Sequence, residues 1–179
     1  MTTIADFKAK LTGGGARANQ FRISLIPPVL VGGASNAGRA IEFLCKAASL
    51  PQSDVTDIPV YYRGRPVHLA GEREFQPWTL TLINDTNFAI RDAFESWSHL
   101  MVNYNATDGN TSPIDYQTDA TVYQLDRNGN TLKSYTFKDV WPISVGAIEL
   151  SYEQNQAIEE FQVTLQFNYF KPLRVAGAA

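Results

Sequence analysis

The chain has 179 residues, of which 44% are hydrophobic and 12% aromatic, and a formal net charge of −3. These values are those of one globular domain and exclude a disordered chain, and the negative charge argues against a protein that coats nucleic acid. The single cysteine, Cys45, excludes an internal disulfide and a multi-cysteine metal cluster. Its apolar surroundings predict a buried, inert thiol.

Residues 1–16 are predicted to form an N-terminal arm. The run Gly13, Gly14 and Gly15 lacks the Lys-Ser/Thr of a phosphate-binding loop, and no strand precedes it, so we expect a mobile tether. No apolar run in the chain is long enough for a signal peptide or a membrane span. We therefore expect the protein to be made and folded in a cytoplasm.

Apolar and polar residues alternate in the next segment, "NQFRISLI", which places Phe21, Ile23 and Leu25 on one face of a predicted strand. A loop is predicted at residues 31–40, a short apolar segment at 41–51 and a second loop at 52–59.

Residues 60–71 predict a tight hairpin with its turn at Arg63–Gly64–Arg65. Pro66 lacks a backbone N–H and keeps the returning strand off a central position in a sheet. The two arginines and Arg73 make a basic patch in an acidic chain. A phosphate or nucleic-acid site is disfavoured, because the cations of the chain are dispersed and acidic residues bracket Arg73. Exposure to solvent and ion pairing across an interface are the two alternatives.

A second alternating strand is predicted at residues 75–85, with Trp78, Leu80 and Leu82 on its apolar face. A helix is predicted over residues 88–104, where apolar residues recur at spacings of four, three and four. It is the only helix that the sequence predicts. Its core-facing residues are Ile90, Phe94, Trp97 and Met101.

The last sixty residues are predicted to be mostly strand. A type I′ turn at Asn128–Gly129 closes a hairpin that pairs Leu125 with Leu132. Two more alternating strands follow at residues 145–153 and 160–170. The whole pattern predicts a mainly β fold, an antiparallel β-sandwich or barrel with one flanking α-helix.

Several of these strands have a polar face without cations, whereas surfaces in water usually carry lysine and glutamate. Assembled together, such faces would form a wet, neutral to negative surface that DNA could pass without being gripped. A pocket wall or a subunit interface fits the pattern equally well. The residues concerned are Thr79, Thr81, Glu149, Ser151, Glu153, Gln162, Thr164, Gln166 and Asn168.

Neither catalytic residues nor a metal or cofactor site is predicted. The two histidines, His68 and His99, have no partner at metal-ligand spacing, and the serines beside Trp97 lack the glycines of a nucleophile elbow. We therefore expect a protein that is not an enzyme and has no small-molecule ligand.

Four segments resemble the tail tube protein of contractile-tailed, myovirus-type bacteriophages. They are "LTGGGARANQFRISL", "FLCKAASLP", "VYYRGRPVHLAGEREFQPWTLTLINDTNFAIRDAFESW" and "YQLDRNGN…YTFKDVWPISVGAIEL", and the similarity runs from about Leu11 to Phe170. The resemblance implies homohexameric rings that stack into a tube, with each subunit adding strands to a barrel around a central channel. It also implies a fold related to the inner tubes of type VI secretion systems, which carry protein cargo.

The resemblance further implies the surroundings of the protein. Expected partners are a contractile sheath, baseplate hub and tail terminator proteins, a tape measure protein in the lumen, and viral DNA that passes without specific binding. The polar strand faces would line the channel. The expected contacts with neighbouring rings or subunits are Asp54, Asp57, Arg63, Arg65 and Arg73.

The expected division of the chain is an arm at 1–16, a tail-tube barrel domain at 17–172 and a C-terminal tail at 173–179, in a virion tail assembled in the host cytoplasm. Two alternatives remain open from the sequence. One is the inner tube of a contractile secretion or injection system that carries protein effectors. The other is a stand-alone β-sandwich binding module.

Overall fold

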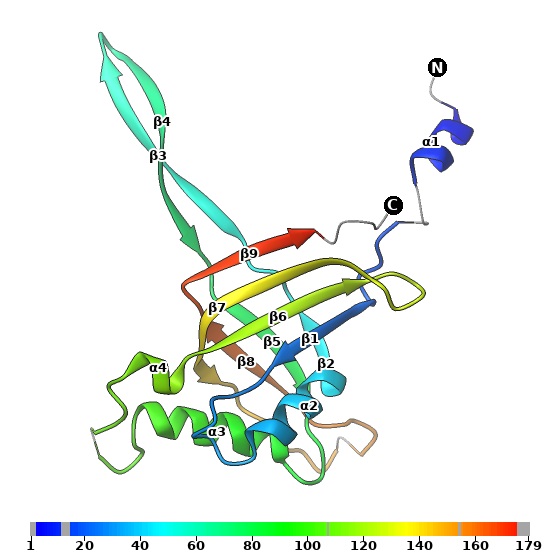
Figure 1. The fold of residues 1–179 in the computed structure, drawn as a ribbon, viewed down its shortest axis with the longest axis vertical. Coiled ribbons are helices and arrows are strands. Elements are labelled where there is room, and N and C mark those ends of the chain that lie inside the picture. The colour runs from blue at the N-terminus through cyan, green and yellow to red at the C-terminus, as the bar shows by residue number, and fades with distance from the viewer. Residues whose placement is uncertain (1–2, 12–14, 107, 154, 175–179) are drawn as a thin grey trace.

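A computed structural model describes residues 3–11, 15–106, 108–153 and 155–174 of the chain. The fold is mainly antiparallel β, as the sequence predicts, and consists of a seven-stranded sheet, the helices at residues 34–44 and 89–101 on one side of it, and a projecting two-stranded ribbon (Figure 1). The described strands are β1 (Phe21–Leu25), β2 (Cys45–Ala48), β3 (Ser53–Tyr62), β4 (Arg65–Phe75), β5 (Trp78–Ile83), β6 (Thr118–Leu125), β7 (Thr131–Val145), β8 (Glu160–Gln166) and β9 (Tyr169–Arg174). The described helices are α1 (Ile4–Lys10), α2 (Ala34–Leu44), α3 (Ala89–Met101) and α4 (Pro113–Tyr116), none of them long and apolar enough to cross a membrane.

The sheet is strongly bent about β7. The strand order is β1–β6–β7–β8–β5–β2, with β9 paired to β7 as well. The first part of β7 pairs with β6 and β9, and its last residues, from Trp141 on, pair with β8. Asp139 has a left-handed backbone (φ 59°) next to this change of partners. The sheet is not closed into a barrel within one chain, so β1, β2 and β9 are left as edge strands, each with one partner strand in the described part of the chain.

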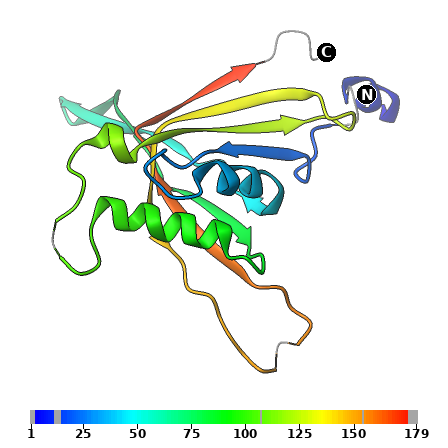
Figure 2. The same cartoon turned by 60° about the horizontal axis from the view of Figure 1, so that its bottom comes forward.

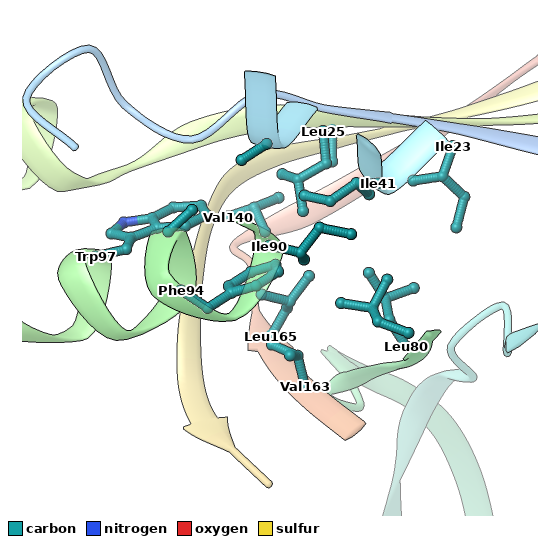
Figure 3. Packing of buried hydrophobic residues seen from close by; sticks show 14 of the residues in the cluster. Ile23, Leu25, Ile41, Leu80, Ile90, Phe94, Trp97, Val140, Val163 and Leu165 are labelled. Carbon is teal, nitrogen blue, oxygen red and sulfur yellow. The ribbon is translucent and has the colours of Figure 1, made fainter. Parts of the chain in front are cut away.

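The core lies between the sheet and two adjacent helices, α2 and α3 (Figure 3). Strand alternation supplies one wall, in which Leu80 and Leu165 are fully buried, and α3 supplies the other through Ile90, Phe94 and Trp97. Met101, at the end of α3, is half-buried. The indole N–H of Trp97 donates to the carbonyl of Tyr116 at 2.6 Å, which satisfies a polar atom that would otherwise be costly to bury.

The helix α2 contradicts the prediction of a single helix. It covers part of the segment that we expected to be a loop, and its buried residues are Ala34, Ala37, Gly38 and Ile41, at helical spacing. Three of the four are too small to stand out in an apolar pattern. Their small size allows close packing: a Cβ on Gly38 would lie 3.0 Å from the Ile26 side chain and 3.2 Å from the Leu25 carbonyl.

One loop and one turn also differ from expectation. The predicted loop at 52–59 is strand, so the hairpin of β3 and β4 is much longer than predicted. In the hairpin of β6 and β7, Gly129 has φ 82° but Asn128 does not have positive φ, so the turn is not type I′ and Leu125 pairs with Thr131 rather than Leu132. The Asp126 carboxylate accepts hydrogen bonds from the backbone of Asn128 and Asn130 and thereby sets this longer turn.

The expected arm contains the helix α1, which the sequence analysis missed, and none of its residues is buried. Of the predicted glycine tether, residues 13 and 14 lie outside the described part of the chain, as do residues 175–179 of the expected C-terminal tail. The strand β9 continues through Arg174.

Candidate assembly and channel surfaces

The polar residues of β5 and β8 form one continuous face. The register pairs Thr79 with Thr164 and Thr81 with Gln162, and paired residues in antiparallel strands point to the same side of a sheet. The alternate residues of both strands are buried beneath the helices, so this polar face lies on the opposite side of the sheet. Gln166, opposite Trp141 of β7, continues the face.

A single ion pair marks one edge of this polar face. By alternation, Glu160 lies on the same side of β8 as Gln162, and its carboxylate is 2.6 Å from the ammonium of Lys46 on β2. Lys46 sits at a bulge in the pairing of β2 with β5, so its position could not be read from the sequence. Because Glu160 neutralises it, Lys46 adds no unpaired positive charge to the face.

The segment 145–153 is not the alternating strand that we predicted. β7 ends at Val145, where its pairing with β8 also ends, and Glu149, Ser151 and Glu153 lie in the connection that follows. Gly146 makes the exit possible: its N–H donates to the Gln162 carbonyl, and a Cβ there would lie 2.7 Å from that oxygen. Without a partner strand beyond this point, Leu150 and Tyr152 are exposed.

The connection nevertheless brings predicted channel residues together. Glu149 and Ser151 line a hollow of about 600 Å³ with Thr81 and Gln162 of the polar face. The Arg91 guanidinium of α3 donates to the Gly146 carbonyl at 2.5 Å and so fixes the start of the connection. Glu153 is exposed in the connection, outside this hollow.

Asn168 lies at the bend between β8 and β9, where it is exposed. Its amide donates to the Asp139 carboxylate at 2.8 Å, so it contacts the bend in β7.

The hairpin of β3 and β4 projects away from the sheet (Figure 1). Arg63 and Gly64 both have positive φ, 47° and 82°, as a two-residue turn of the primed type requires. Phe75 anchors the other end of the hairpin, with its ring 5.8 Å from that of Phe167 and 5.3 Å from that of Phe170. The base of the hairpin is therefore held by aromatic packing, and both faces of the ribbon are exposed to solvent.

The charges of the hairpin are arranged along its length. About halfway along the hairpin, the Asp57 carboxylate is 2.6 Å from the His68 imidazole, and near the base Arg73 donates to the Ser53 hydroxyl at 2.7 Å. At the tip, neither Arg63 nor Arg65 has a salt-bridge partner within the described parts of the chain. Asp54, beside the base, accepts a hydrogen bond from Gln52.

The outward side of α3 carries a second hollow, of about 440 Å³, lined by Asp92, Glu95, Ser96, His99 and Tyr104. The His99 ring stacks on Tyr104 with 5.0 Å between centroids. Arg91, by contrast, is turned towards the core: its guanidinium lies over the Phe161 ring.

Two features of the described residues bear on chemistry, the reactivity of the single cysteine and the grouping of possible metal ligands. Burial raises the pKa of the Cys45 thiol to about 11, which makes the group a poor nucleophile. Among the residues that the structure describes, no three His, Cys, Asp or Glu side chains gather in a way that could hold a metal ion.

Comparison with known proteins identifies the family of this chain. The model of the phage tail tube protein family matches residues 16–172. The tail tube protein gp19 of Enterobacteria phage T4 is 32% identical over 161 residues, which cover 89% of this chain and 93% of the T4 protein.

Solved structures share the fold at low sequence identity. A chain of the extracellular contractile injection system PVC, from its sheath/tube terminator structure, has a TM-score of 0.65 at 12% identity, covering 89% of this chain and 96% of that one. An Hcp protein has a TM-score of 0.50 at 14% identity, covering 89% of this chain and 93% of that one. With the family model matched over residues 16–172, the chain belongs to the phage tail tube protein family, as a structural component of a contractile tail.

Proposed function

We propose that six copies of the protein join into a ring, that the rings stack into a hollow tube, and that the polar face of β5 and β8 lines the channel through which viral DNA passes. The observation that carries this proposal is the neutral polar face itself. Thr79, Thr81, Gln162 and Thr164 lie on the side of the sheet that no helix covers, and the one lysine at the edge of that face is paired with Glu160. DNA needs several free cations to be held, and this surface offers none.

Ring formation is supported by the open sheet. The edge strands β1, β2 and β9 have one partner strand each, and exposed strand edges tend to pair with other chains. A barrel that closes across copies would remove those edges. Six copies at −3 each would give the ring a formal charge of −18, which disfavours adhesion of DNA.

Stacking of rings is assigned to the hairpin of β3 and β4. The unpaired cations Arg63 and Arg65 would meet acids such as Asp54 or Asp57 of the neighbouring ring, while Arg73 steadies the base of the hairpin. Replacing both Arg63 and Arg65 by glutamate is expected to leave soluble rings that no longer grow into tubes. Tubes of normal length from this variant would contradict the assignment.

The proposed partners follow from a tube in a contractile tail. A sheath would surround the tube and could contact the outward side of α3, where Asp92, Glu95 and His99 are exposed or half-buried. Baseplate hub and terminator proteins would close the two ends, and a tape measure protein would occupy the lumen before DNA. The protein would be assembled in the host cytoplasm, act in the virion and have no catalytic role.

A second candidate function is the inner tube of an injection system that carries protein, favoured by the fold shared with the PVC chain. Genes next to that of this protein would separate the two, since a phage tube is encoded with capsid and packaging proteins.

Negative-stain microscopy of the purified protein at increasing concentration tests the proposal. We expect six-membered rings and then tubes. A protein that remains monomeric at every concentration would contradict it and would favour a stand-alone binding module.

A further inference from the structure

The helix α1 has an apolar stripe without a partner in its own chain. Ile4, Phe7 and Leu11 recur at spacings of three and four, which places them on one side of the helix, and they are 78%, 66% and 45% exposed. The helix begins with a capping box between Thr3 and Asp6. A helix of seven residues is not stable by itself in water, so its apolar stripe needs a surface to pack on.

The hairpin of β3 and β4 has an apolar face of similar length. Ile58 is paired with Leu69 and Val60 with Val67, so the four side chains share one side of the ribbon, and each is about half exposed, between 47% and 52%. Tyr62 extends this face towards the tip. A two-stranded ribbon is also marginal by itself in water.

We propose that α1 of one copy packs its apolar stripe onto this hairpin face of the adjacent copy in the ring. This inference rests on the ring of the proposed function. Figures 1 and 2 both place α1 and the hairpin at opposite ends of the molecule, and Figure 1 shows them on the same side of the sheet. In a head-to-tail arrangement of side-by-side copies, the α1 end of one molecule faces the hairpin end of the next.

Length agrees with this pairing. The stripe from Ile4 to Leu11 is ~10 Å long at 1.5 Å per residue. The hairpin face from Ile58 to Tyr62 is ~13 Å long at the rise of an antiparallel strand. One α1 therefore covers most of one hairpin face.

Charge also agrees with it and sets the direction. On β3, alternation puts Asp54, which is paired with Glu74, on the same side of the ribbon as Ile58 and nearer the base, whereas Lys8 lies beside the apolar stripe in the last turn of α1. In Figure 1 the N-terminal end of α1 and the tip of the hairpin both point away from the sheet. Docked in that direction, Lys8 lies towards the acids Asp54 and Glu74 of the hairpin.

Cysteine cross-linking tests the contact directly. The variant Phe7→Cys/Val67→Cys, with the unreactive Cys45 left in place, is assembled and mildly oxidised. We expect a ladder of disulfide-linked species up to the closed ring on non-reducing gels. The matched control, Asp6→Cys/Val67→Cys, moves the thiol to the other side of α1 and is expected to give at most a trace of the ladder, and each single variant is expected to stop at dimers.

The outcomes separate this inference from the proposed function. Rings or tubes without the Phe7→Cys/Val67→Cys ladder, or a disulfide formed within one copy, would overturn the α1 contact and leave the ring intact. The absence of rings for the unmodified protein would overturn both. As a second readout, Phe7→Glu is expected to raise the concentration at which rings form, and Phe7→Leu is expected to leave it unchanged; equal behaviour of the two variants would contradict the contact.

Discussion

Cys45 shows how the environment of one residue decides its chemistry. Its thiol is half-buried on β2, and burial raises its pKa from 9.0 to about 11 because the thiolate loses solvation. A two-unit rise lowers the thiolate fraction at pH 8 about a hundredfold. The native protein should therefore react with iodoacetamide at pH 8 about a hundredfold more slowly than the protein in urea, measured by mass spectrometry. Equal rates would show that the thiol is accessible and ionised.

The same shift has a consequence for stability. The unfolded chain releases the thiol proton near pH 9, whereas the folded chain holds it to about pH 11. The contribution of this group to the free energy of unfolding is therefore complete below pH 9 and is lost as the pH rises towards 11.

Phe94 tests the core that α3 forms with the sheet. Its side chain is fully buried beside Ile90 and Leu165, so Phe94→Ala should lower the free energy of unfolding by about 3–5 kcal/mol through lost burial and a cavity. The matched control is Phe43→Ala on α2, where the side chain is 83% exposed and the change should stay within about 0.5 kcal/mol in the unassembled protein. Urea denaturation measures both, and similar losses would mean that α3 does not build the core as described.

At the residue scale, the sequence predicted which strand residues are buried, but it did not predict which distant groups a side chain contacts. The apolar residues of β5 and β8 are buried as their period of two indicates, because the sheet is covered on one side only. The role of Arg91 could not be predicted in the same way. Its inward contact depends on where the Gly146 carbonyl lies, and that is a consequence of tertiary structure.

Among the elements, the hairpin of β3 and β4 is held in shape by a glycine. A Cβ on Gly71 would lie 2.5 Å from the Thr56 hydroxyl and 3.0 Å from the Thr56 carbonyl, at a bulge between the two strands. Gly71→Ala should therefore distort the ribbon and impair tube growth, while the melting temperature of the core changes little because the hairpin is a separate sheet. Microscopy and thermal unfolding measure the two effects.

Gly32→Ala is the control for this prediction, since a Cβ there meets nothing within 4 Å. Tubes of equal length from the Gly71→Ala variant would show that the hairpin shape does not govern stacking.

The polar face of β5 and β8 can be tested by adding charge. Gln162→Lys with Gln166→Lys would place two cations per copy, or twelve per six-membered ring, on the face proposed to line the channel. DNA should then adhere to the tube interior with a strong dependence on salt, and ejection should slow. Ejection kinetics at several ionic strengths measure this. The control, Thr86→Lys with Asn87→Lys, adds two cations at exposed residues between β5 and α3 and should leave the rate unchanged. Equal slowing by both pairs would contradict the assignment of the channel face.

The elements that the sequence missed share a physical reason. α2 buries alanine and glycine rather than large side chains, so its helical period is hidden in an apolar pattern. The segment 145–153 shows the opposite error: its alternation resembles a strand, but Gly146 directs the chain off the sheet and no neighbouring strand is available. Strand propensity is a property of one segment, whereas a strand also needs a neighbouring strand with which to pair.

For the whole molecule, the fold class could be predicted from the sequence. The sequence separated the proposed stacking surface from the proposed channel surface only in part. The mainly antiparallel fold follows from strand periods and turn residues. The open sheet does not, because an isolated sequence cannot show whether a barrel closes within one chain or across several. The residues assigned to stacking all lie on the hairpin, and those on β5 and β8 lie together on one face of the sheet, whereas Glu153 and Asn168 lie outside both surfaces.

The most direct measurement is a cryo-EM map of the assembled protein at side-chain resolution. The account predicts a six-membered ring in which Thr79, Thr81, Gln162, Thr164 and Gln166 face the bore and α3 faces outwards. A map with α3 against the bore, or with unpaired lysine and arginine side chains along the inner wall, would contradict it.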